Sequence, residues 1–123
     1  MKLSAIFHPW LHRHGRCRGV VLWRWGTRQV ELWLVPAGEY VPRHTHPNVE
    51  STLRIWSVEA EIGVLRPGRK EQREKPSMFC GRAFDIGPLD VHWLMAWTPT
   101  FLLNVQRWVG RPPSSAAVDW VDA

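Results

Sequence analysis

The sequence is poor in the features by which several protein classes are recognised. Its two cysteines, Cys17 and Cys80, form no C-x-x-C pair. Two thiols are too few for a disulfide framework, so we expect buried or incidental thiols in a reducing compartment. The apolar run in residues 1–7 is too short for a signal peptide, because His8-Pro9 interrupts it. No stretch approaches the length of a membrane span, so a soluble, cytoplasmic protein without membrane contact is expected.

Acidic residues are the scarcer charged type, with 11 Asp and Glu against 16 Lys and Arg. A basic balance can indicate binding to nucleic acid. Here the positive residues are scattered, and the dense group at residues 69–75 also carries Glu71 and Glu74. No familiar nucleic-acid motif is present. We therefore interpret the charge as a solvated surface and expect no nucleic-acid partner.

No long segment has a helical period, and strand-like runs separated by turn signals take its place. Residues 19–25 and 28–35 are rich in β-formers, and Gly26-Thr27 between them predicts a hairpin. Many short strands separated by turns favour a sandwich or barrel. We expect two further strands within residues 50–65 and three more at 77–86, 91–97 and 101–108.

A single domain is expected, since 123 residues can bury about two-thirds of their unfolded surface. We divide it into an irregular lead-in at 1–18, a barrel at 19–109 and an extended tail at 110–123 that docks by Trp120. The polar, proline-bounded run at 67–76 is expected to be a solvated loop. The three histidines of the lead-in have no neighbouring carboxylate and are interpreted as surface imidazoles: His8, His12 and His14.

Two imidazoles and a carboxylate lie close together in the segment that follows Gly38. His44 and His46 are two residues apart, so on a strand they would project to the same side. Glu50 follows, and His92 lies far along the chain in another strand-like run. Neutral imidazoles and a carboxylate suit a divalent metal such as Zn, Fe, Ni or Mn. The alternative is that these histidines lie on a solvated strand face and bind nothing.

The segment resembles the first sequence motif of the cupins, G-x5-H-x-H-x3,4-E-x6-G. Gly38, His44, His46 and Glu50 occupy its positions, and Ser57 stands where the motif ends in glycine. The resemblance implies an all-β fold, the cupin-type double-stranded β-helix or jelly-roll barrel. It also implies one divalent metal ion, Fe, Mn, Ni or Zn, inside the barrel.

The second cupin motif, G-x5-P-x-G-x2-H-x3-N, is present in degenerate form. Gly81 and His92 keep its spacing, whereas Gly87, Leu89 and Ala96 stand where the family has Pro, Gly and Asn. The resemblance covers roughly residues 20–108. It implies the metal-ligand set His44, His46, Glu50 and His92.

Strand parity predicts the surroundings of the metal. If Glu50 points inward, then Thr52, Arg54 and Trp56 point inward too and are candidate ligand-binding residues. A buried guanidinium needs a partner, and the carboxylate or phosphate of a small anionic organic ligand would provide one. The alternatives are that Arg54 pairs with Glu50 or another protein carboxylate, or that a bulge turns it outward.

The same parity leaves an apolar set outside the barrel: Leu53, Ile55, Trp93, Met95 and Trp97. Such a set is too apolar for a free surface, so a second sheet or a second subunit should cover it. We therefore expect a homodimer with Trp93 or Trp97 near the interface.

The resemblance leaves the reaction open, because cupins include dioxygenases, isomerases, epimerases, lyases and non-catalytic binders. An octahedral ion with four protein ligands would keep two positions for a substrate or O2. No separate acid/base pair is visible, and Tyr40 is the only tyrosine, so catalytic residues stay unassigned. Two hypotheses compete with an enzyme. One is a non-catalytic binding or sensing cupin, and the other is an interaction protein whose Trp-rich face binds a macromolecule around a structural metal.

Overall fold

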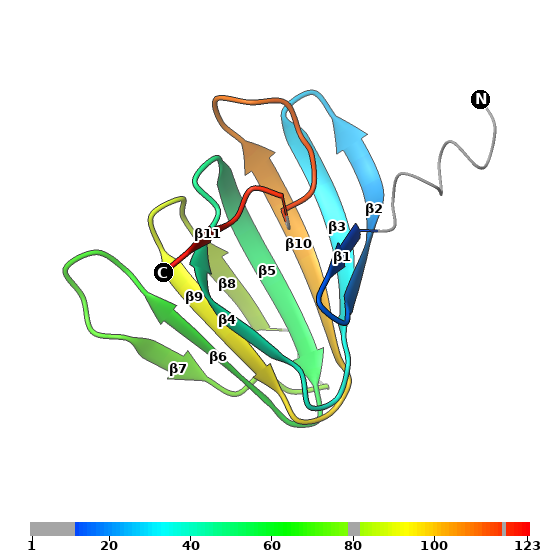
Figure 1. Ribbon diagram of the computed structural model, residues 1–123, viewed down its shortest axis with the longest axis vertical. Helices are drawn as coiled ribbons and strands as arrows, with labels where there is room; N and C mark the ends of the chain where they lie inside the picture. Colours follow the sequence, from blue (N-terminus) through cyan, green and yellow to red (C-terminus); the bar gives the residue numbers. More distant parts are fainter. Residues whose placement is uncertain (1–11, 79–81, 117) are drawn as a thin grey trace.

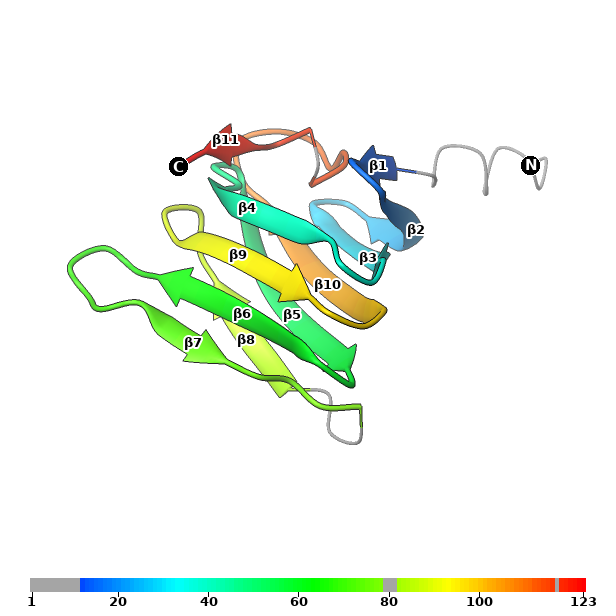
Figure 2. The same cartoon turned by 60° about the horizontal axis from the view of Figure 1, so that its bottom comes forward.

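Two antiparallel sheets face each other and enclose the core (Figures 1 and 2). The structure is a computed structural model that describes residues 12–78, 82–116 and 118–123. One sheet has six strands in the order β1-β2-β3-β10-β5-β8, and the other has five in the order β11-β4-β9-β6-β7. The strands are β1 His12–His14, β2 Cys17–Trp25, β3 Arg28–Val35, β4 Tyr40–Thr45, β5 Val49–Ser57, β6 Ala60–Leu65, β7 Gln72–Glu74, β8 Arg82–Ile86, β9 Val91–Ala96, β10 Thr100–Trp108 and β11 Val121–Asp122.

The all-β expectation is confirmed, and so is the hairpin, in which β2 pairs with β3. Gly26 has φ 58°, a conformation that glycine adopts without steric cost and that the tight turn requires. In the described part of the chain, no helix has the length and apolarity that a membrane span requires.

Two local expectations are wrong. Residues 12–18 are not irregular, because they form β1 and the start of β2. The polar run at 67–76 is not all loop, since it contains β7, which pairs with β6. Both β1 and β7 lie at sheet edges, and polar composition in so short an edge strand does not reveal pairing. The expectations for His8, Cys80 and Gly81 fall outside the described residues.

The predicted parity of β5 is also wrong. Val49, Ser51, Leu53 and Ile55 point into the barrel, and Ile55 is fully buried. Because side chains alternate along a strand, an inward Val49 sends Glu50 outward and inverts the expected pattern. The main core cluster lies between the sheets and consists of Cys17, Trp33, Val35, Leu53, Ile55, Ala60, Ile62, Val64, Ile86, Leu94 and Ala96.

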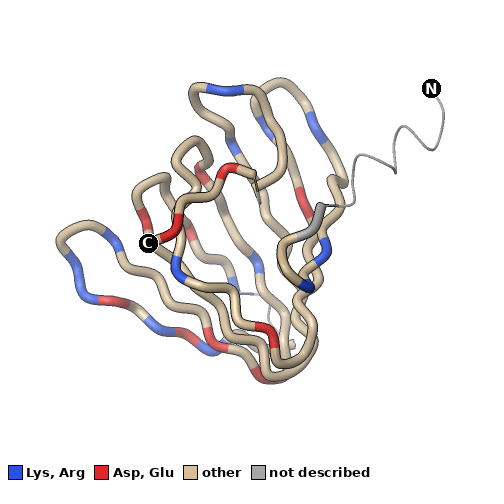
Figure 3. Tube along the Cα trace, viewed as in Figure 1, with Lys and Arg blue, Asp and Glu red and all other residues tan. Residues whose placement is uncertain are grey.

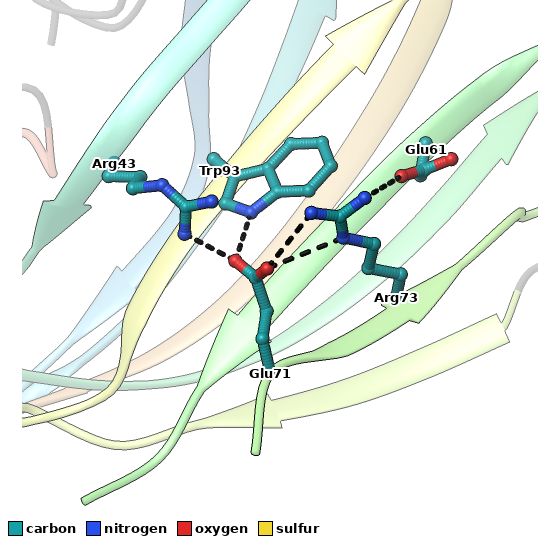
Figure 4. A network of polar contacts seen from close by, with 5 residues as sticks. All are labelled: Arg43, Glu61, Glu71, Arg73 and Trp93. Carbon is teal, nitrogen blue, oxygen red and sulfur yellow. Dashed lines mark hydrogen bonds and ion pairs between the residues drawn. The ribbon is translucent and has the colours of Figure 1, made fainter.

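Trp93 was expected at a subunit interface, but the chain itself covers this ring (Figure 4). Trp93 is 8% exposed and donates a 2.7 Å hydrogen bond from Nε1 to Glu71. The guanidinium groups of Arg43 and Arg73 lie 5.7 and 5.5 Å from the indole centroid and also bind Glu71. The hydrogen bond from Arg43 is the main reason why the pKa of Glu71 falls to about 2. Gly63 allows this packing, since a Cβ there would lie 2.1 Å from Trp93 Nε1.

Exposed apolar side chains instead gather on the outer face of the six-stranded sheet. Leu34, Phe101 and Trp56 lie side by side across β3, β10 and β5. Val105 and Trp23 continue the patch toward β2, and Phe101 and Val105 are 41% and 44% exposed. We call this patch the outer apolar face. The basic residues are spread over both sheets and interspersed with acidic ones (Figure 3).

Candidate metal centre

Three imidazoles meet inside the barrel. His44 on β4 and His92 on β9 are directly opposite each other in the β4–β9 pairing, and His46 follows the end of β4. One ring nitrogen from each histidine lies within 4.8 Å of those of the other two, and all three side chains are buried. The structure therefore brings together three of the four residues that the sequence proposed as metal ligands, and this group could hold a metal ion.

The outer nitrogen of each ring lies at a backbone carbonyl oxygen. Nδ1 of His44 is 2.6 Å from the oxygen of Pro42, that of His46 is 2.5 Å from Asp119, and that of His92 is 3.2 Å from Asp90. A carbonyl oxygen only accepts, so each Nδ1 carries the proton and each Nε2 keeps its lone pair. Metal-binding histidines show the same arrangement, in which a backbone carbonyl fixes the tautomer and the ring orientation.

The inner nitrogens are spaced as metal ligands are. Nε2 of His44 and Nε2 of His46 lie 3.0 Å apart. With the proton of each ring on Nδ1, two lone pairs face each other there, which is unfavourable without a cation or a proton between them. Two ligands at about 2.1 Å from one ion and at right angles to each other are about 3 Å apart. The donor set therefore fits a divalent metal.

Burial keeps the three imidazoles uncharged. It is the largest cause of the lowered pKa of each ring, and the pKa of His92 is lowered to about 3 by burial first and by its neighbours second. The neighbouring imidazoles lower the pKa values of His44 and His92 further. The rings are consequently neutral at physiological pH, as metal ligands must be.

Glu50 does not join this group. It lies on the outer side of β5, where Arg107 donates hydrogen bonds of 3.1 Å to both carboxylate oxygens. The proposed four-ligand set is corrected to three imidazoles. Three residues separate Glu50 from His46, and in this chain the next position, Ser51, is the one that points inward.

The predicted ligand-binding residues also lie outside the barrel. Thr52 donates a 2.9 Å hydrogen bond to Asp85, and Arg54 is exposed in the same outward row as Trp56. This corrects the expectation that Thr52, Arg54 and Trp56 surround the metal. The cause is again the inverted parity of β5.

A cavity of about 90 Å³ opens beside the three imidazoles. Its walls are mostly apolar and include Val35, Leu53, Ile55 and Leu102. His14 and Asn104 also line the cavity and were missed by sequence reasoning, which expected Trp120 to dock the tail but did not place it at this cavity.

The C-terminal segment closes one side of the cluster. Trp120 stacks on His44 with 3.5 Å between ring centroids and 8° between planes, and His14 stacks on the same indole at 4.0 Å. β11 pairs with β4, and Asp119 binds the backbone nitrogen and side chain of Asn48. The tail therefore docks by Trp120 as expected. His14 was taken for a surface imidazole, and no sequence signal links it to His44.

Comparison with solved structures identifies the fold. CapF of Staphylococcus aureus, a capsular polysaccharide assembling protein, superposes with a TM-score of 0.70 at 13% identity over 91% of this chain and 31% of that one. KdgF from Halomonas sp. superposes with a TM-score of 0.63 at 14% identity, over 80% of this chain and 85% of that one. A Klebsiella pneumoniae protein described as having a double-stranded β-helix domain superposes with a TM-score of 0.57 at 17% identity, over 84% of this chain and 87% of that one. The chain has the cupin fold.

The chain spans about a third of the length of the CapF chains that it matches. No protein-family model matches the sequence, and no curated protein matches it significantly. Identities of 13–17% establish the fold alone. The function of this protein must therefore be argued from its own site.

Proposed function

We propose that this cupin binds one divalent metal ion through His44, His46 and His92, and that a small molecule binds beside the ion in the cavity. The observation that carries the proposal is the convergence of one ring nitrogen from each of three buried imidazoles whose Nδ1 atoms lie at backbone carbonyl oxygens. A bound ion of this kind supplies Lewis-acid activation of a ligand oxygen. Fe, Mn, Ni and Zn all accept imidazole ligands.

The proposed ligand is a small organic anion, for a reason different from the one the sequence offered. Arg54 is outside, and the described residues that line the cavity include no Lys or Arg. Three neutral imidazoles, however, leave the double charge of the ion uncompensated. A carboxylate that enters an open position of the ion would supply the missing negative charge.

The lining also bears on the kind of activity. Among the described residues it contains no Asp, Glu, Lys or Tyr side chain that could serve as a general acid or base. A metal-dependent dioxygenase or a non-catalytic binding module is therefore better supported than an isomerase or lyase that needs a protein base. His14 and Cys17 also line the cavity. Burial raises the pKa of the Cys17 thiol to about 11, so His14 is the better candidate for proton transfer.

Metal analysis of protein purified without added ions tests the proposal. We expect close to one divalent ion per chain, removable by a chelator at neutral pH while the circular dichroism spectrum of the barrel persists. A structural metal would instead take the fold with it when removed. A protein that neither retains nor takes up Fe, Mn, Ni or Zn would contradict the proposal.

We also propose a homodimer, formed through the outer apolar face rather than through the set expected from sequence. A second copy fits this face, because Arg18 on β2 and Asp85 on β8 lie at opposite sides of it. Arg18 lies in the row of Trp56 and Asp85 in the row of Thr52, four residues apart along β5. A two-fold axis inclined to the strands would therefore bring these unlike charges together across the interface.

We expect light scattering at micromolar concentration to give a dimer for the wild type and a monomer for Phe101→Asp. A charge in the centre of the apolar patch would be buried without a partner in the dimer. Trp97→Asp is the matched control, since Trp97 is similarly exposed but lies outside the outer apolar face, and it should remain dimeric. A monomeric wild type would contradict this proposal.

A further inference from the structure

Asn104 is a polar side chain that faces the cavity without a partner. It is an inward residue of β10, is 5% exposed, and lines the cavity together with the three imidazoles. Its Oδ1 is buried and has no hydrogen-bond partner among the described residues. Native proteins rarely bury a polar atom without satisfying it, so such an atom calls for a specific explanation.

The neighbours of Asn104 do not satisfy it. In register it lies opposite Glu31 on β3 and Leu53 on β5. Glu31 is fully buried, and its Oε1 already accepts hydrogen bonds from Gln106 and from the backbone nitrogen of Ala116. Its Oε2 is a second buried acceptor without a partner. When Glu31 is ionised, this row of the barrel has no donor for Asn104 Oδ1, whereas a protonated Glu31 would carry one on Oε2. Asn104, unlike Glu31, lines the cavity and so also has a bound ligand within its reach.

We propose that Asn104 Oδ1 accepts a hydrogen bond from a hydroxyl group of the small molecule bound at the metal. This inference rests on the proposed metal function and narrows its ligand to a small hydroxycarboxylic acid. The ion would take the carboxylate, the apolar walls formed by Leu53 and Leu102 would contact the carbon chain, and Asn104 would take the hydroxyl.

The size of the cavity limits the length of that acid. A dry protein cavity of about 150 Å³ accommodates benzene. The cavity here is about 90 Å³, so a ligand of roughly two or three carbons fits it. A longer acid would have to displace the wall or the stacked Trp120.

Propanoate and 3-hydroxypropanoate form a matched pair of probes, because they differ by one hydroxyl group. Both are titrated into cobalt-loaded protein, and binding is followed by the visible absorption of the metal. We expect the wild type to bind 3-hydroxypropanoate about fivefold more tightly than propanoate, the size of one neutral hydrogen bond. Asn104→Leu should bind the two acids equally, with its affinity for propanoate unchanged.

Arg54→Met is the matched control for substitution of a polar residue on the same sheet. Arg54 lies on the outer side of β5, so this variant should keep the fivefold preference. The melting temperature of metal-free Asn104→Leu should equal that of the wild type or exceed it by about 3 to 6 °C, since the change removes an unsatisfied polar group. If Asn104→Leu does not fold, Asn104→Ala should show the same loss of preference.

The outcomes separate this inference from the proposal on which it rests. A protein that binds cobalt but prefers neither acid overturns the role of Asn104 and leaves the metal centre standing. A preference that persists in Asn104→Leu, together with a lower melting temperature, shows that Asn104 only pairs with a protonated Glu31, and it also overturns the inference. A protein that takes up no cobalt overturns both proposals.

Discussion

The double variant His44→Ala/His92→Ala is expected to lose its metal completely while the barrel stays folded. Two of three ligands are removed, and the single imidazole of His46 cannot hold a divalent ion at micromolar concentration. The strand pairing of β4 with β9 runs through the backbone and does not depend on these rings. Elemental analysis by mass spectrometry and far-ultraviolet circular dichroism measure the two quantities.

Glu50→Gln is the matched control for this variant. The cupin motif assigns a metal ligand to this position, but the structure places Glu50 outside against Arg107. We expect Glu50→Gln to retain the full metal content of the wild type. Equal metal loss in Glu50→Gln would show that the site is the four-ligand set, whereas unchanged metal in the double variant would place the ion elsewhere.

The second large effect concerns the buried carboxyl group of Glu31. Burial raises its pKa to about 7, against 4.5 for the ordinary group. The folded protein therefore holds this proton more tightly than the unfolded chain does. The stabilisation is complete below pH 4.5 and is lost as the pH rises to 7, and it amounts to roughly 3 kcal/mol.

Glu31→Gln should abolish this pH dependence, since the amide stays neutral and keeps an oxygen for Gln106 and Ala116. We expect the difference in free energy of unfolding, variant minus wild type, to increase by roughly 3 kcal/mol between pH 4.5 and pH 8. Urea titrations of the metal-free variant and wild type at each pH measure this difference in free energy of unfolding. The imidazoles titrate in both proteins, so their contribution cancels in the difference.

Glu59→Gln, at an exposed carboxyl group, controls for the substitution itself and should show a nearly constant difference across the same pH range. A constant difference for Glu31→Gln as well would mean that Glu31 is not held in its neutral form by burial. A decrease toward pH 8 would mean that its ionised form is the one that the fold stabilises.

The C-terminal segment contributes to the metal centre through two contacts. Asp119 supplies the carbonyl that orients His46, and Trp120 lies flat on His44. A residue about 70 positions away in sequence thereby fixes the ring of a proposed ligand. The order of this segment and the geometry of the metal centre are coupled, because each contact is present only when the tail is docked on β4.

Several features were determined by the sequence itself, because they depend on neighbours along the chain. The two-residue spacing placed His44 and His46 on one side, and the glycine turn at Gly26 placed the first hairpin. The resemblance to both cupin motifs added His92 to the set. Local periodicity and turn chemistry are readable residue by residue, and so the fold class and three proposed ligands could be predicted.

The tertiary structure corrected the direction in which β5 faces. Val49, Leu53 and Ile55 alternate with Glu50, Thr52 and Arg54, so apolar parity by itself favours the observed register, whereas the motif assignment of Glu50 as a ligand pointed to the opposite one. The position of Glu50 and of the expected ligand-binding residues followed from that one choice. Asn104 and Trp120 meet the site, and Glu31 lies opposite Asn104, through pairings between distant strands that no local pattern encodes. The long-range packing of the barrel therefore set the contents of the cavity.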